Sequence, residues 1–201
     1  MEYIKKEYET HKEEIKKRLG EFFGLDRKKW FHELVFCILT PQSNAEKCWN
    51  AVLKLKEKEF EDKVIESCII KNTRFHRNKT RYLKEAKNKW QDIEKKVDSI
   101  NKENVKETRN WIAENVTGLG LKEASHFLRN IGKSYNHLAI LDRHILSQLE
   151  KTRVINKLES LNRKNYLIIE EKMKQFSEQV EIPLDALDLL FFKLESGRIF
   201  K

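Results

Sequence analysis

The scarcity of turn-forming residues is the strongest constraint on the fold of this chain. Its 201 residues include only six glycines and two prolines, whereas these two types make up roughly 12% of an average globular sequence. β-Sandwiches and barrels need turns at short intervals, so the composition argues against them and predicts an all-α protein. Intrinsic disorder is excluded as well, because 39% of the residues are hydrophobic and 10% are aromatic.

Apolar residues recur at helical spacing along most of the chain. Phe31, Leu34, Val35 and Ile38 fall on one helix face, and Pro183 suits the first turn of another helix. The pattern predicts helices near residues 2–19, 27–39, 43–56, 59–70, 78–96, 102–115, 121–131, 142–150, 160–181 and 183–195. No Gly-, Pro- or Ser-rich linker divides the chain, so we expect any two subdomains to pack closely.

Membrane, disulfide and metal chemistry find little support in the sequence. No stretch approaches the roughly 20 apolar residues of a membrane span, and the N-terminal segment is charged throughout, unlike a secretory signal. We therefore expect an intracellular protein. The three cysteines, Cys37, Cys48 and Cys68, are odd in number and lack CxxC spacing. They also fall short of the four thiols that an iron–sulfur cluster needs, so we expect no metal and no redox cofactor.

The charge balance points to a polyanionic partner. Lysine and arginine outnumber aspartate and glutamate by 41 to 32, which fits nucleic acid, although hot environments also favour such surfaces. Basic residues are also concentrated in one segment, since no acidic residue lies between Glu66 and Glu85. The basic residues of that segment are Lys71, Arg74, Arg77, Lys79, Arg81 and Lys84. A solvated helix face is the alternative interpretation.

Half of the glycines fall in one short segment, ENVTGLGLKEASHFLRNIG, as Gly118, Gly120 and Gly132. A TGLGLK sequence between two helical patterns predicts a tight turn in which glycine adopts positive φ. The amides that open the next helix at Leu121 and Lys122 can bind a phosphate. The alternative is an ordinary Gly-capped joint between helices.

Two residues near this turn have the chemistry of a reaction centre. Lys122 falls in the first turn of its helix, where the helix dipole disfavours an ammonium. A neutral amine is a nucleophile that can form a Schiff base at an electrophilic sugar carbon. Asp142 follows the apolar run HLAIL and is placed to cap the next helix and stay ionised. Taken singly, the two are typical of a surface lysine and an ordinary N-cap; together with the glycine turn they are specific.

With these residues in this order, the chain resembles the helix-hairpin-helix DNA glycosylases. VTGLGLK followed by AILDRHI is similar to the Gly-rich hairpin, catalytic lysine and catalytic aspartate of that superfamily. The short chain, the segment HELVFCILTPQSNAE at residues 32–46 and the ending SGRIFK resemble the archaeal and thermophilic branch of 8-oxoguanine DNA glycosylase/AP lyases. The chain lacks the four-cysteine motif of endonuclease III-like members and has no room for the β domain of eukaryotic-type enzymes.

The resemblance implies a bifunctional DNA repair enzyme that excises 8-oxoguanine from duplex DNA and cleaves the abasic site by β-elimination. Lys122 would attack C1′ of the damaged nucleotide, and Asp142 would assist base loss and stabilise the sugar cation. It also implies a cytoplasmic, nucleoid-associated monomer that binds duplex DNA containing 8-oxoguanine or abasic sites. The alternatives are a glycosylase for another damaged base, such as an oxidised pyrimidine, and a non-catalytic helix-hairpin-helix module.

The resemblance also implies one glycosylase unit over residues 1–201, divided into two helical subdomains. We expect the first to comprise about 1–39 plus 140–201, and the second about 40–139, including the hairpin at 116–121. A stacked base must be extruded before it can be excised, so we expect DNA to lie between the two subdomains.

Further residues take recognition roles through the same resemblance. The carboxylate of Lys201 would accept the hydrogen that 8-oxoguanine carries at N7 and guanine lacks, the alternative being a disordered tail. Phe192 would stack on the flipped base while Phe191 belongs to the core. Gln42 would fill the hole left by the extruded base.

The contacts to the DNA backbone are expected from two places. Gly118 and Gly120 would bring hairpin amides to phosphates, a grip that does not depend on base sequence. Arg74, Arg77 and Lys79 would contact phosphates through their side chains.

Overall fold

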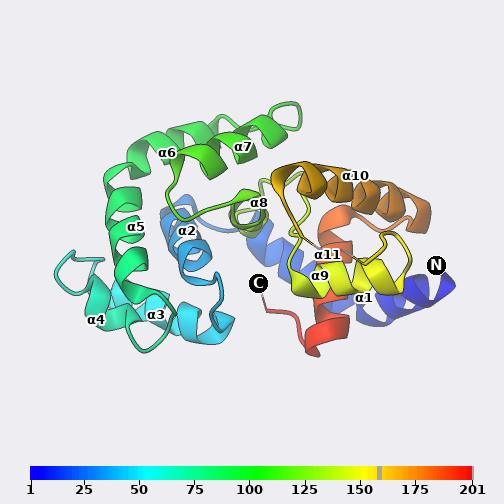
Figure 1. Cartoon of the computed structure of the whole chain (residues 1–201), viewed down its shortest axis with the longest axis horizontal. Coiled ribbons are helices and arrows are strands. Elements are labelled where there is room, and N and C mark those ends of the chain that lie inside the picture. Colours follow the sequence, from blue (N-terminus) through cyan, green and yellow to red (C-terminus); the bar gives the residue numbers. More distant parts are fainter. Residues whose placement is uncertain (158–159, 201) are drawn as a thin grey trace. The chain divides into compact units, whose positions relative to one another are not determined.

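A computed structural model describes residues 1–157 and 160–200 of the chain. In this part of the protein every regular element is a helix (Figure 1), which confirms the all-α prediction. The elements are α1 (Glu2–Phe23), η1 (Arg27–Lys29), α2 (Trp30–Leu39), α3 (Ala45–Glu57), α4 (Ile65–Ile69), α5 (His76–Asn88), α6 (Trp90–Asp98), α7 (Val105–Asn115), α8 (Leu121–Asn130), α9 (Arg143–Lys151), α10 (Arg163–Val180) and α11 (Leu184–Ser196). None of these described helices is long and apolar enough to cross a membrane.

Two of the predicted helices are interrupted, and aromatic packing explains where. The chain turns at Glu59 and Phe60, which both have positive φ, so only α4 remains of the helix predicted over 59–70. The helix predicted over 78–96 breaks at Lys89. Both breaks bring an aromatic ring onto Phe31, because Phe60 and Trp90 each pack edge-on at 5.1 Å between ring centroids. Tertiary contacts therefore override helix propensity at these points.

The chain forms two compact units whose limits differ from the expected subdomains. Unit 1 contains residues 1–25, 101–106 and 128–201, and unit 2 contains residues 26–100 and 107–127. The main difference is α2, which was expected with the N-terminal helix. It belongs to unit 2 because it packs against α3 and α5.

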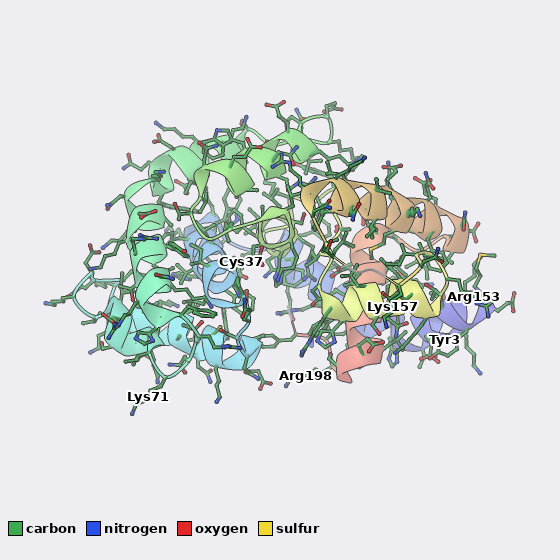
Figure 2. All side chains as sticks on the ribbon, viewed as in Figure 1. Tyr3, Cys37, Lys71, Arg153, Lys157 and Arg198 are labelled. Atoms are coloured by element: carbon green, nitrogen blue, oxygen red, sulfur yellow. The ribbon has the colours of Figure 1, made fainter. Side chains whose placement is uncertain are left out.

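In unit 2, α2 is the most deeply buried helix. Phe36, Cys37 and Leu39 are completely shielded from solvent, and Figure 2 shows Cys37 on α2 among surrounding side chains. Lys71, by contrast, extends outward from the turn after α4 (Figure 2) and is exposed. This burial fixes the C-terminal end of α2, where the loop that carries Gln42 begins.

In unit 1, α11 is the central helix. It packs against α1, α9 and α10. Phe191 lies on its buried face, and the ring centroids of Phe191 and Phe176 are 6.3 Å apart. After α11 the chain continues through exposed Arg198 (Figure 2) to Phe200, the last described residue. Lys201 lies outside the described residues.

Candidate functional site

The glycine turn between α7 and α8 adopts the expected sharp conformation. Gly118 has a φ of +91°, and a Cβ added there would collide with the ring of Tyr82. Only glycine fits this position without strain, because other residues disfavour a positive φ and because Tyr82 fills the space that a Cβ would need. Gly120 does not have positive φ; it precedes α8 as its N-cap. The prediction of a positive φ is thus confirmed at Gly118 and wrong at Gly120.

Lys122, in the first turn of α8, forms an ion pair with its neighbour Glu123. Nζ of Lys122 lies 2.8 Å from Oε1 of Glu123, and the lysine side chain is 29% exposed. The second carboxylate oxygen of Glu123 accepts the amide N–H of Gly120 at 3.1 Å. One carboxylate thus binds both the hairpin backbone and the candidate nucleophile.

Sequence reasoning missed Glu123, although a signal for it was present. An acidic residue three positions after an N-cap commonly accepts the N-cap amide, as in a capping box. Because Glu123 occupies the Gly120 amide, a phosphate could use that donor only by displacing the carboxylate.

Asp142 caps α9, as its place in the sequence predicts. Its backbone is extended, with φ −89° and ψ 178°. Its Oδ1 accepts the amides of His144 and Ile145 at 2.8 and 2.9 Å. Two amide donors hold the carboxylate in one orientation. Asp142 lies in unit 1, whereas Lys122 lies in unit 2.

Two further carboxyl groups of unit 1, Asp185 and Asp188 on α11, are buried. Asp188 accepts a backbone hydrogen bond from Ile140 and lies 3.8 Å from the guanidinium of Arg129. Burial raises the pKa of Asp188 to about 7; the Arg129 charge opposes the rise, and the charges of Asp142 and Asp185 add to it. Sequence reasoning did not single out these two aspartates, because leucines and phenylalanines surround them.

Phe192 lies beside the Asp142 turn within unit 1. Its ring packs edge-on against His144 at 5.3 Å between centroids, and the side chain is half-buried. Phe191 is completely buried, which confirms that it belongs to the core. The role assigned to Phe192 in base stacking stays a prediction.

Gln42 lies at the tip of the loop between α2 and α3, residues 40–44, which we call the Gln42 loop. The loop is closed by a backbone hydrogen bond from Ser43 to the carbonyl of Thr40 at 2.9 Å. Gln42 is exposed and has a φ of +55°. This is the third position of a turn, where a left-handed backbone normally selects glycine or asparagine.

Arg74 and Arg77 are exposed, as phosphate contacts require. The guanidinium of Arg74 lies over the ring of Phe75, 5.3 Å from its centroid. Phe75 is 51% exposed and has a φ of +58°. An exposed aromatic face beside a cation suits contact with a base as well as with a phosphate. Sequence reasoning did not single out Phe75, because one phenylalanine in a basic run gives no sign of its exposure.

Lys79 is not available to DNA, which corrects the prediction that it contacts a phosphate. The residue is only 4% exposed. Its Nζ donates to the carbonyls of Leu39 and Pro41 at 2.7 and 2.8 Å and to the hydroxyls of Thr73 and Ser43 at 2.7 and 3.2 Å. In a helix rich in basic residues, the sequence could not distinguish this inward-facing lysine from the outward-facing ones.

Burial of the Lys79 ammonium costs hydration free energy, which its hydrogen bonds offset. The pKa of Lys79 is lowered to about 8, mainly by burial. The charges of Cys48 and Glu123 oppose this shift, and those of Lys122 and Arg74 add to it. At neutral pH the side chain is therefore still mainly an ammonium. Among the described residues, no group of three or more His, Cys, Asp or Glu side chains could hold a metal ion.

Comparison with known proteins places this arrangement among DNA repair enzymes. A family profile described as 8-oxoguanine DNA glycosylase matches residues 15–182. The 8-oxoguanine DNA glycosylase/AP lyase of Fusobacterium nucleatum is 44% identical over 215 aligned residues, which cover 100% of this chain and 96% of the relative.

Solved structures agree with the sequence comparison. The Methanocaldococcus jannaschii 8-oxoguanine glycosylase/lyase, crystallised with DNA containing 8-oxoguanine, matches with a TM-score of 0.87 and 33% identity, and each chain is covered completely. The 8-oxoguanine DNA glycosylase of Thermotoga maritima matches with a TM-score of 0.83 and 25% identity, over 100% of this chain and 97% of that one.

Proposed function

This chain belongs to the 8-oxoguanine DNA glycosylase family, and from that membership we propose that it excises 8-oxoguanine from duplex DNA and cleaves the resulting abasic site. Relatives from bacteria and archaea that match almost the whole chain are named for both activities. The observation that carries the proposal for this chain is the placement of Lys122 directly after the Gly118 hairpin, together with Asp142 as the cap of α9.

In the reaction we propose, Nζ of Lys122 attacks C1′ of the damaged nucleotide. The Nζ–C1′ bond forms while the bond from C1′ to the base breaks, and the electron pair of that bond leaves with the base. The C1′–O4′ bond then breaks, and O4′ takes one of the protons of the attached nitrogen. The opened sugar is thereby bound to Nζ of Lys122 as a protonated Schiff base. Loss of a proton from C2′ then expels the 3′ phosphate, which cuts the strand.

Asp142 and Glu123 have separate tasks in this mechanism. The carboxylate of Asp142, held by two backbone amides, stabilises the positive charge that develops on the sugar. Glu123 orients the side chain of Lys122 through their ion pair. The amine must leave that pair and lose its proton before it can attack.

The remaining residues hold the substrate. We assign stacking on the flipped base to Phe192 and recognition of the damaged base to Lys201. Gln42 fills the space that the base leaves in the duplex. Arg74, Arg77 and the hairpin backbone at Gly118 contact phosphates, and the Gly120 amide joins them once a phosphate displaces the Glu123 carboxylate from it. The chain acts as one monomeric glycosylase unit on chromosomal DNA, and so in the cytoplasm at the nucleoid.

Borohydride trapping tests the proposal. Reduction of a Schiff base between the protein and a duplex containing 8-oxoguanine should give a stable covalent adduct. The adduct should disappear in Lys122→Gln and persist in the control Lys54→Gln, which removes an exposed lysine from α3. An adduct undiminished in Lys122→Gln would reject the assignment. DNA binding without any adduct would favour a non-catalytic module, and release of oxidised pyrimidines in preference to 8-oxoguanine would favour the other specificity.

A further inference from the structure

We propose that Lys79 is a positioning residue, whose buried ammonium holds the Gln42 loop in the shape needed to enter the DNA duplex. The inference rests on the proposed function and on the role of Gln42 within it. It concerns a residue that neither touches the substrate nor belongs to the Lys122 and Asp142 chemistry.

Lys79 connects three separate parts of unit 2. From α5 its Nζ reaches the carbonyl of Leu39 at the end of α2, Pro41 and Ser43 in the Gln42 loop, and Thr73 before α5. An ammonium has three N–H donors, so these four acceptors, at 2.7 to 3.2 Å, use all of them. We call these five residues the Lys79 network.

The acceptors are also linked to one another. The hydroxyl of Thr73 lies 2.7 Å from the carbonyl of Leu39 and 2.9 Å from the hydroxyl of Ser43. The hydroxyl of Ser43 in turn accepts the backbone amide of Arg74 at 2.9 Å. The network therefore joins the Gln42 loop to the segment that carries Arg74.

The position of the charge has a clear electrostatic reason. α2 ends at Leu39, and the last carbonyls of a helix lack partners within the helix and carry its negative dipole end. A cation at this point satisfies the Leu39 carbonyl and the Pro41 carbonyl that follows it. This interaction compensates for the burial of the ammonium.

Gln42 lies between two anchor points of the network. The carbonyl before it belongs to Pro41 and the hydroxyl after it to Ser43, and both accept from Lys79. A left-handed backbone at a non-glycine residue such as Gln42 is strained and persists only where the surroundings enforce it. The network supplies that constraint, so that the exposed Gln42 side chain is presented by a rigid turn.

The test compares two duplexes that differ in how much base-pair opening the enzyme must perform. In one, 8-oxoguanine is paired with cytosine; in the other, it lies opposite a stable abasic analogue, where no partner base has to be separated. Lys79→Met keeps the apolar stem and removes every donor. We expect its single-turnover excision rate to fall about 10- to 100-fold on the paired duplex, a range typical of misplacement in an active site. On the opened duplex it should stay within about threefold of wild type.

A double-mutant cycle identifies the part of the protein that Lys79 acts through. If Lys79 acts by holding Gln42, then Lys79→Met combined with Gln42→Ala should be no slower on the paired duplex than the slower single variant. Lys54→Met, which removes one exposed charge from α3, is the control for charge loss. Multiplicative defects in the double variant, or equal losses on both duplexes, would overturn the inference.

The folding of each variant is followed by circular dichroism and thermal melting. If Lys79→Met does not fold, Ser43→Ala removes one partly buried acceptor of the network and should give a smaller defect with the same preference for the opened duplex. The absence of such a preference would reject the inference. A wild-type protein inactive on both duplexes would instead reject the proposed function, so the two failures are distinguishable.

Discussion

The carboxylate of Glu123 lies between the Lys122 amine at 2.8 Å and the Gly120 amide at 3.1 Å. It therefore accepts the N-cap amide of α8 and is also the ion-pair partner of the candidate nucleophile. Glu123→Ala should lower the free energy of unfolding by about 0.5 to 2 kcal/mol through loss of the cap. Glu123→Gln keeps an oxygen for Gly120 and should stay within about 0.5 kcal/mol of wild type in urea unfolding. Equal stability of both variants with wild type would show that the cap contributes nothing.

Substitutions of Asp142 can separate its role as the N-cap of α9 from its proposed role in stabilising charge on the sugar. Asparagine is as good an N-cap as aspartate, so Asp142→Asn should retain stability, whereas Asp142→Ala should lose about 1 kcal/mol. Neither variant keeps the negative charge, and we expect excision by both to slow about 10²- to 10³-fold. Single-turnover kinetics and thermal melting measure the two effects. Near-normal excision by Asp142→Asn would contradict the proposed stabilisation of the sugar cation.

Gly118 should not tolerate a side chain. Its φ of +91° and the contact with the ring of Tyr82 predict that Gly118→Ala destabilises the protein by about 1 to 3 kcal/mol. The matched control is Gly20→Ala on α1, where a Cβ meets no atom within 4 Å. That change should stabilise the helix by about 0.5 to 1 kcal/mol. Chemical unfolding of the two variants should therefore shift in opposite directions.

The salt dependence of DNA binding should separate exposed from buried basic residues. Arg74→Ala and Arg77→Ala should each make the slope of log affinity against log salt shallower by about 1, because each removes one phosphate contact. Lys79→Met should leave the slope unchanged, since its ammonium faces the end of α2. Fluorescence anisotropy with an undamaged duplex measures the slopes. A shallower slope for Lys79→Met would mean that the buried amine reaches the DNA.

Asp188 should make stability depend on pH. Its folded pKa of about 7 lies above the ordinary value of 3.8, so between pH 4 and 7 the folded state keeps a proton that the unfolded state has lost. Protonated Asp188 therefore contributes to the free energy of unfolding. This contribution is fully present below pH 4 and is lost as the pH rises through 7, and the free energy changes by at most about 1.4 kcal/mol per pH unit.

The comparison with Asp188→Asn isolates this effect. The difference in unfolding free energy between wild type and Asp188→Asn should move in favour of wild type as the pH falls from 7 to 4. Arg129 does not titrate in this range, so its loss of a partner in the variant gives a constant offset. A difference independent of pH would show that Asp188 is already ionised at pH 4.

The parts of the site that depend on neighbouring residues in the chain could be predicted from the sequence. The positive φ of Gly118 and the capping of α9 by Asp142 follow from local chemistry, namely the absence of a Cβ and a short acidic side chain before a helix. The pairing of Glu123 with Gly120 is equally local and was overlooked.

What depends on residues distant in sequence could not be predicted. The breaks at Phe60 and Lys89 serve contacts with Phe31, which lies about thirty and sixty positions earlier. Asp188 looks like part of an apolar stripe until Arg129 and Ile140 are placed beside it. Such contacts overrule local preference because burial and hydrogen bonding outweigh helix propensity.

The sequence by itself determined the helical class, the glycine turn at Gly118 and the capping of α9 by Asp142, because each follows from residue types and spacing within one stretch of chain. Only the tertiary structure decided which basic residues face solvent. Arg77 and Lys79 lie two positions apart on α5, yet one is exposed and the other is enclosed by oxygen atoms from Leu39, Pro41, Ser43 and Thr73. A buried charge exists only where the folded chain brings enough acceptors together to replace water.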